Sequence, residues 1–97
     1  MDINLSRKTA IVTGATGQLG RTIARTLAQC GADVAVHYLN NRAMAVQLTE
    51  EITGMGRKAL AVQADVACKD SVDAMAETVI SALGAPQIVI NCAVSQY

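Results

Sequence analysis

The chain is 97 residues long, which is the size of one domain or of part of one. With 52% hydrophobic and 16% charged residues, it has enough apolar side chains for a core, which excludes wholesale disorder. Eight lysines and arginines balance eight aspartates and glutamates, and two tyrosines are the only aromatic residues. Because excess positive charge and stacking side chains are both lacking, nucleic acid is not expected as a partner.

The cysteines Cys30, Cys68 and Cys92 form no C-x-x-C pair, and the chain has one histidine. No metal site is therefore expected, and unpaired thiols are typical of a reducing compartment. The segment 1–8 contains an acid and no apolar run, unlike a secretory leader, and no apolar stretch reaches the length of a membrane span. We expect a cytoplasmic protein that does not use the membrane as a partner.

Four short apolar runs predict β-strands, at residues 9–13, 34–38, 59–63 and 88–90. None alternates cleanly between apolar and polar residues, which indicates strands that are buried on both faces, as in parallel sheets. The first three runs begin 25 residues apart without any matching sequence repeat. This spacing is typical of strands that alternate with helices.

Between these runs, apolar residues recur at helical spacing and predict three helices. Their stripes are Leu19, Ile23, Leu27 and Cys30, then Met44, Leu48, Ile52 and Met55, and finally Val72, Met75, Val79 and Leu83. Asn40 or Asn41 is available as the N-cap of the second helix, and Gly31 and Gly84 follow the first and the third as stop signals.

Strands that alternate with helices predict the α/β fold class, with a Rossmann-type doubly wound parallel sheet. Such sheets have the strand order 3-2-1-4-5-6, and this chain supplies the strands for the 3-2-1-4 part. The run at 88–90 would then be an open apolar edge, which favours aggregation. We therefore expect residues 1–97 to be the N-terminal part of a single, longer domain.

The most informative stretch, TGATGQLG, directly follows the first strand and opens the first helix. Gly14 permits a tight turn, Gly17 leaves room for a pyrophosphate, and Gly20 allows close packing of the helix on the sheet. The free N–H groups at the helix start, near Gln18 and Leu19, would face the anion. The alternative is a glycine-rich turn without a ligand. No Gly-Lys-Ser/Thr sequence closes the turn, which disfavours nucleoside triphosphate hydrolysis.

Two further segments follow predicted strands. Asp65-Val66 follows the third strand, and Asn91-Cys92-Ala93-Val94 ends the fourth. Together with the glycine turn, they resemble the Asp-Val pair and the NNAG-like segment of the short-chain dehydrogenase/reductase family. The segments 31–38 and 58–66 are most similar to 3-oxoacyl-carrier-protein-reductase-type members. The resemblance covers essentially the whole chain but only the first half of a family domain.

The resemblance implies which residues would hold the cofactor. The pyrophosphate would lie against Gly14, Gly17, Gln18 and Leu19. The adenine would contact Asp65 and Val66, and the adenosine ribose would be bordered by Asn91 and Ala93. In this sequence Gln18 stands where the family has its middle glycine, and Cys92 and Val94 replace an Asn and a Gly of the NNAG segment.

The end of the second strand, residues 37–42, reads HYLNNR and contains no acid. An NAD-preferring site carries a carboxylate here for the ribose diol, whereas Arg42 could pair with a 2′-phosphate. We therefore expect NADP, bound by Tyr38, Asn40 and Arg42, with NAD as the alternative. Arg42 as a solvated residue of the second helix also stays open. His37 is expected to be a sheet residue with a satisfied ring.

The resemblance further implies catalysis by a Tyr, a Lys and a Ser in a Ser…YxxxK pattern. Ser95 and Tyr97 are present but no Lys follows, so no catalytic residue is assigned. By resemblance, the complete protein is an NAD(P)-dependent oxidoreductase, a homotetramer that transfers hydride between the cofactor and a carbonyl or secondary alcohol. This segment would hold the adenosine–pyrophosphate half and be inactive alone. If Tyr97 is the true end, the alternative is a non-catalytic nucleotide-binding module.

Overall fold

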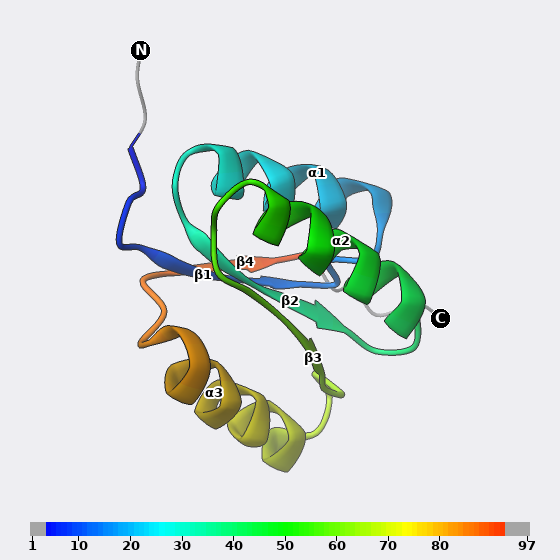
Figure 1. Cartoon of the computed structure of the whole chain (residues 1–97). Coiled ribbons are helices and arrows are strands. Elements are labelled where there is room, and N and C mark those ends of the chain that lie inside the picture. Colours follow the sequence, from blue (N-terminus) through cyan, green and yellow to red (C-terminus); the bar gives the residue numbers. More distant parts are fainter. Residues whose placement is uncertain (1–3, 93–97) are drawn as a thin grey trace.

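Our computed structural model describes residues 4–92 of the chain. In chain order the elements are β1 (Thr9–Thr13), α1 (Gln18–Gln29), β2 (Asp33–Tyr38), α2 (Arg42–Gly54), β3 (Ala59–Gln63), α3 (Lys69–Leu83) and β4 (Ile88–Asn91). The strands form one parallel sheet in the order β3-β2-β1-β4, with α1 and α2 on one face and α3 on the other (Figure 1). The predicted α/β class and the 3-2-1-4 order are confirmed. Each strand starts within one residue of its predicted start.

The two central strands are the most deeply buried part of the molecule. Every residue of β1 is buried, and so is every residue of β2 except Asp33. In β3 only Val62 is buried, and β4 alternates between half-buried and exposed residues. The predicted burial on both faces therefore holds for the centre of the sheet. It fails at the edges, where each strand has only one neighbouring strand.

Helix α1 faces the sheet with small side chains. Its buried residues are Gly20, Ala24 and Ala28. The prediction that Leu19 heads the buried stripe is wrong, because its side chain is 66% exposed, while Ile23 and Leu27 are half-buried beside the core. A Cβ at Gly20 would collide with the carbonyl oxygen of Gly14 and lie 2.8 Å from the Cα of Ala15. The helix thus packs too closely on the turn for large residues to lie beneath it.

The other two helices follow their predicted stripes more closely. Helix α2 is capped by Asn41, one of the two predicted N-caps, whose Oδ1 accepts a hydrogen bond from the Met44 N–H at 3.1 Å. Leu48 and Ile52 are fully buried, whereas Met55 lies beyond the helix end and is 37% exposed. The buried residues of α3 are Met75 and Val79, with Val72 and Leu83 packed beside them.

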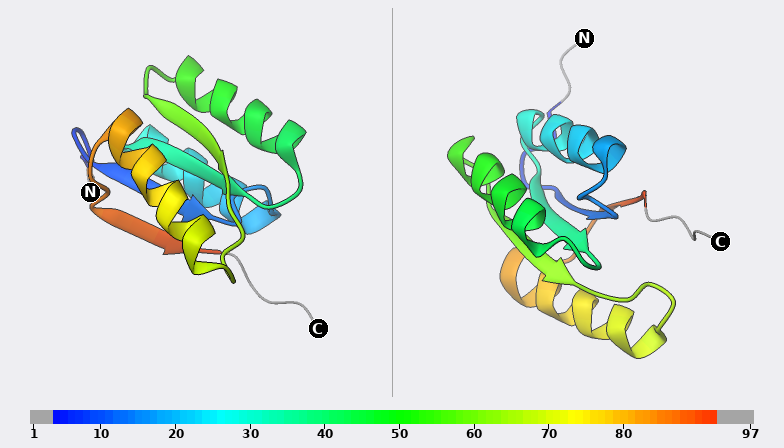
Figure 2. Two further views of the ribbon diagram at one scale, coloured as in Figure 1. Left: turned by 90° about the horizontal axis from the view of Figure 1, so that it is seen from below. Right: turned by 90° about the vertical axis from the view of Figure 1, so that its right-hand side faces the viewer.

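Because all four strands are parallel, the segments that follow them meet at one edge of the sheet (Figure 2). These segments are the turn after β1, the loops after β2 and β3, and Cys92 after β4. No helix within residues 4–92 is long and apolar enough to cross a membrane.

Candidate functional site

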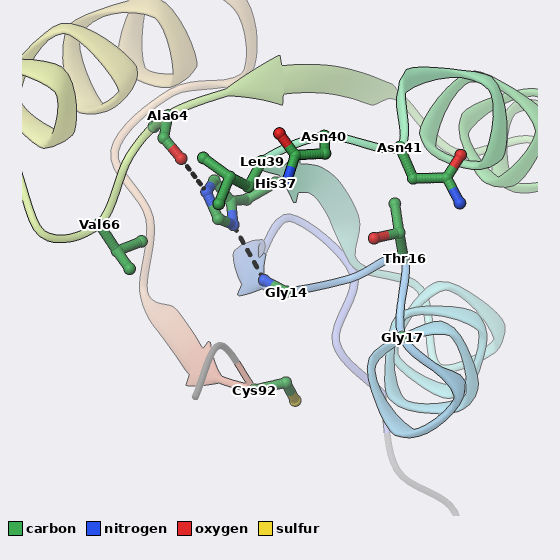
Figure 3. Close-up of a pocket in the computed structure, with 10 residues that line it drawn as sticks. All are labelled: Gly14, Thr16, Gly17, His37, Leu39, Asn40, Asn41, Ala64, Val66 and Cys92. Carbon is green, nitrogen blue, oxygen red and sulfur yellow. Dashed lines mark hydrogen bonds between the residues drawn. The ribbon is translucent and has the colours of Figure 1, made fainter. Parts of the chain in front are cut away.

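A cleft of about 330 Å³ opens at the carboxyl ends of the strands. Open α/β sheets bind their ligands at this edge, at the point where the strand order reverses. Apart from His37, which lies on β2, the lining residues come from the segments that follow the four strands (Figure 3). They are Gly14, Thr16, Gly17, His37, Leu39, Asn40, Asn41, Ala64, Val66 and Cys92.

The glycine-rich turn forms one wall of the cleft. Gly14 has a φ of 64°, a left-handed conformation that glycine adopts without steric cost. Its carbonyl oxygen accepts a hydrogen bond from the Gly17 N–H at 3.2 Å, and the next residue, Ala15, donates its N–H to the His37 carbonyl at 3.0 Å. The turn is therefore closed on itself and attached to β2.

The start of α1 offers hydrogen-bond donors beside this turn. The helix begins at Gln18, and the Arg21 N–H makes the first intrahelical bond, to the Gly17 carbonyl at 2.9 Å. The N–H groups of Gln18, Leu19 and Gly20 come before that bond, and Gly17 provides no side-chain cap. The first turn of the helix also contains no acid. This geometry, together with the positive end of the helix dipole, suits an anion.

His37 lines the cleft but is almost fully buried, with 2% of its surface exposed. Its Nδ1 accepts a hydrogen bond from the Gly14 N–H at 2.9 Å, and its Nε2 lies 2.7 Å from the Ala64 carbonyl oxygen (Figure 3). The prediction of a sheet residue with a satisfied ring is confirmed.

The loop after β3 places its two predicted residues differently. Val66 lines the cleft and is 49% exposed. Asp65 does not line it, since its Oδ1 accepts from the Ala67 N–H at 2.9 Å, while its own N–H donates to the Ser71 Oγ at 2.9 Å. These bonds make Asp65 a turn residue ahead of α3. Its contact with adenine stays a prediction.

Three residues were predicted at the end of β2, and only Asn40 lines the cleft. Tyr38 is 9% exposed and packs in the core on the face of α1 and α2. Arg42 is the exposed first residue of α2, next to the N-cap Asn41.

At the end of β4, Asn91 does not line the cleft but lines a second groove beside α3. Its Oδ1 accepts a hydrogen bond from the Thr13 hydroxyl at 2.8 Å, and the Cys92 N–H donates to the Thr13 carbonyl at 3.0 Å. These bonds hold Cys92 beside the glycine turn. Ala93, the other predicted ribose contact, lies outside the described residues, as do Ser95 and Tyr97.

Several lining residues were not predicted: Thr16, Leu39, Asn41, Ala64 and Cys92. Each belongs to a segment that directly follows a parallel strand. The signal that would have found them is therefore topological, because all segments after parallel strands converge on one edge of the sheet.

The strongest ion pair among residues 4–92 lies away from the cleft. Arg25 on α1 and Glu51 on α2 form two hydrogen bonds, of 2.7 and 3.2 Å. The hydrogen bond from Arg25 holds the pKa of Glu51 below its ordinary value and, in return, raises the pKa of Arg25. This pair ties the two helices together. Within the same residues, no cluster of His, Cys, Asp or Glu could hold a metal ion.

The strand order, the crossover helices and the glycine turn after β1 together define a Rossmann-type fold. Residues 8–96 match the short chain dehydrogenase family, and the chain belongs to that family.

Known relatives agree with this assignment. The chain is 42% identical over 84 residues to the 3-oxoacyl-(acyl-carrier-protein) reductase FabG of Staphylococcus aureus strain Mu50. The aligned segment covers 87% of this chain and 34% of that relative. It is 37% identical over 87 residues to the hydroxynaphthalene reductase arp2 of Aspergillus fumigatus, covering 90% and 32%. The expected similarity to 3-oxoacyl-carrier-protein reductases is confirmed. The chain spans about a third of the length of these curated relatives.

Solved structures show the same fold. A dehydrogenase/reductase from Sinorhizobium meliloti superposes with a TM-score of 0.90 at 36% identity, over 95% of this chain and 36% of that one. The L-sorbose reductase of Gluconobacter frateurii, complexed with NADPH and L-sorbose, has a TM-score of 0.90 at 30% identity, over 100% of this chain and 37% of that one.

Proposed function

We propose that this chain binds the adenosine and pyrophosphate half of NADP(H) in the cleft at the carboxyl ends of the strands. The observation that carries the proposal is the unpaired start of α1, which borders the cleft directly after a left-handed glycine turn. The N–H groups of Gln18 and Leu19 would donate to the pyrophosphate. Gly14 and Gly17 would leave the space for it.

The end of β2 favours NADP(H) over NAD(H). Among the ten lining residues there is no carboxylate that would repel a 2′-phosphate or bind a ribose diol. Asn40 and Asn41 line the cleft there, and Arg42 begins α2 without an ion pair among the described residues. The exposed guanidinium would pair with the phosphate, assisted by the helix dipole. A 7α-hydroxysteroid dehydrogenase with the same fold was solved with NADH, so NAD(H) is the competing ligand.

The adenine would lie at the loop after β3, against Val66, with Asp65 accepting from its amino group. Asn91 and Ala93 would border the ribose, and Tyr38 would support this region from the core. These assignments rest on the family pattern. The position of Val66 in the cleft supports them, and so does the position of Asn91 one residue before the lining Cys92.

For the whole protein we propose hydride transfer between NADP(H) and a carbonyl or secondary alcohol, with residues 1–97 acting as the N-terminal cofactor-binding part of a longer domain. The reductases among the relatives support this, as does the third of their length that the chain spans. A homotetramer that acts on a small molecule fits the family. The three free cysteines fit a cytoplasmic location.

The test is a calorimetric titration of the 97-residue chain with NADPH and NADH, repeated with Gly17→Ala. In the free chain the added Cβ would lie 3.5 Å from the Gly14 carbonyl, an ordinary contact, so the thermal stability should not change. If the pyrophosphate approaches Gly17, NADPH affinity should fall on the order of tenfold. Gly54→Ala is the matched control, because a Cβ there meets nothing within 4 Å.

Arg42→Ala tests the choice of cofactor in the same assay. It should weaken NADPH severalfold and leave NADH unchanged, because only the 2′-phosphate needs the guanidinium. No binding of either dinucleotide at millimolar concentration would refute the proposed function. Equal loss of both ligands would refute only the role of Arg42.

A further inference from the structure

The single histidine of the chain connects the loops on both sides of its own strand. His37 lies on β2, which runs between β3 and β1 in the sheet. Its ring contacts Gly14 in the loop after β1 and Ala64 in the loop after β3, at 2.9 and 2.7 Å (Figure 3). Its main-chain carbonyl also accepts from the Ala15 N–H at 3.0 Å. One residue therefore holds two consecutive N–H groups of the glycine turn.

The two partners assign the protonation of the ring. A backbone N–H can only donate, so Nδ1 must present its lone pair to Gly14. A backbone carbonyl can only accept, so Nε2 must carry the proton toward Ala64. The ring is therefore neutral and protonated at Nε2. Both nitrogens are occupied, so the ring has no hydrogen bond to offer a ligand.

We propose that His37 is a positioning residue: its neutral ring holds the glycine turn in the shape that binds the dinucleotide, and it makes that binding depend on pH. The inference rests on the proposed function. Gly14 has a left-handed φ of 64° at the start of the turn. The bond from its N–H to the ring sets the direction in which the turn leaves β1, and hence where the start of α1 lies.

Protonation of Nδ1 would remove the acceptor of the hydrogen bond that holds the turn. A proton on Nδ1 would face the Gly14 N–H across 2.9 Å, and two donors cannot share a hydrogen bond. Either the ring or the turn must then move. Since the dinucleotide binds the ordered turn, it binds the neutral form better, and its affinity should fall as the pH is lowered.

None of the titratable or charged side chains of residues 4–92 hydrogen-bonds to the ring. Tyr38 points to the opposite face of β2, into the core under α1 and α2. Asp65, after β3, has Oδ1 occupied by the Ala67 N–H, and Cys92, after β4, is a free thiol on the same cleft. None of the ten described residues that line the cleft is a lysine, an arginine or a carboxylate.

The helix packed against this face adds no charge to its buried side. The residues that α3 buries toward the sheet are Met75 and Val79. On the β1 side, the contacts of the ring are with the backbone of Gly14. Every hydrogen bond that the ring makes among residues 4–92 is therefore with a backbone group.

Two substitutions separate the two bonds of the ring. In His37→Asn, Oδ1 takes the place of Nδ1 and can still accept from Gly14, whereas the side chain is too short to reach Ala64. In His37→Gln, the amide nitrogen takes the place of Nε2 and can still donate to Ala64, but the acceptor beside Gly14 is lost. We expect H37N to bind NADPH within about threefold of the wild-type chain and H37Q on the order of tenfold more weakly. Circular dichroism and melting curves check that both variants fold.

The pH profile is the readout that a space-filling role would not change. NADPH affinity is measured from about pH 8 to about pH 5, in the wild-type chain and in H37N. The ligand phosphate also titrates near pH 6, so the difference between the two profiles is used. The wild-type affinity should fall more steeply than that of H37N. Coinciding profiles, or an H37Q variant that binds like the wild type, would overturn the proposal.

The ligand-free chain provides an independent test. Because the chain has one histidine, the ring nitrogen signals in a ¹⁵N NMR spectrum belong to His37 without further assignment. We expect the pattern of a neutral ring protonated at Nε2, and a Gly14 amide signal that shifts in H37Q far more than in H37N. A proton on Nδ1 would overturn the inference. If the wild-type chain binds no NADPH while these spectra are as expected, the proposed function fails and the link between the loops stands.

Discussion

The two faces of the sheet are covered unequally. On one face, α1 and α2 enclose a cluster of ten buried residues that includes Leu48 and Ile52. On the other, α3 covers a cluster of six buried residues (Figure 2). An apolar groove of about 580 Å³ stays open on this face beside β4. Val89 borders this groove and is 62% exposed.

The two walls of the cleft belong to faces of the sheet that are covered unequally. The glycine turn and the start of α1 belong to the fully covered face, where Gly20 packs directly against the backbone of Gly14 and Ala15. The loop after β3 belongs to the less covered face, and Val66 lines both the cleft and the open groove. Packing therefore fixes the proposed pyrophosphate site more firmly than the proposed adenine site.

The largest expected effect tests whether the two faces of the sheet contribute unequally to stability. Leu48→Ala removes a fully buried side chain of α2 that belongs to the ten-residue cluster, and should lower the free energy of unfolding by about 3–5 kcal/mol. Met75→Ala, on the face of α3 and next to the groove, should lower it by about 2 kcal/mol, since the open neighbour lets the site relax. Urea denaturation of both variants measures the difference. Equal losses would show that the two faces contribute alike.

The next largest effect concerns the close contact between α1 and the turn. Gly20→Ala places a Cβ against the Gly14 carbonyl and the Ala15 Cα, so the helix must shift, at about 1–3 kcal/mol. Gly54→Ala is the control at another helical glycine, where a Cβ meets nothing within 4 Å, and it should stabilise by up to about 1 kcal/mol. Thermal melts compare the two. A Gly20→Ala chain as stable as the wild type would mean that the contact does not position α1.

These residues also mark what could be predicted from the sequence. Strand positions and the role of Gly20 follow from apolar runs and glycine spacing, because both report on local geometry. The 3-2-1-4 order follows from the strand order that doubly wound sheets share. The exposure of Leu19 could not be predicted, since the spacing that favours it does not show how closely the helix approaches the sheet.

Part of the cleft lining could be predicted from local sequence motifs, and part depends on tertiary contacts. Gly14, Gly17, Asn40 and Val66 were predicted from motifs and line it. The two bonds of the His37 ring join residues 23 and 27 positions away along the chain, and Cys92 reaches the cleft through the pairing of β4 with β1. Such contacts are set by tertiary structure, and no local pattern carries them.

A smaller effect is expected from the ion pair that ties α1 to α2. The pKa of Glu51 is lowered by its hydrogen bond with Arg25, so the pair stabilises the fold above the ordinary glutamate pKa of 4.5. That contribution is lost as the pH falls through the lower pKa of the folded state. Glu51→Gln should therefore lower the melting temperature slightly at neutral pH, and the difference should shrink as the pH falls below the ordinary glutamate pKa of 4.5.

The matched control for this ion pair is Asp73→Asn. Its partner Lys69 is 3.9 Å away on the same exposed face of α3, and a pair of this kind contributes almost nothing. Melting curves over a pH series should separate the two variants. A Glu51→Gln difference that persists at low pH would contradict the assignment of the effect to the ion pair.

The smallest effect on stability is expected at the open edge. Val89 is 62% exposed on β4, which within residues 4–92 pairs with β1 alone, so Val89→Lys should change the free energy of unfolding by less than about 0.5 kcal/mol. A lysine on an edge strand hinders pairing with another chain, so self-association measured by sedimentation should fall. Ile80→Lys, on α3 and 51% exposed, adds the same charge away from the edge. If both variants reduce association equally, net charge is the cause. If only Val89→Lys does, the uncovered edge is where copies of the chain meet.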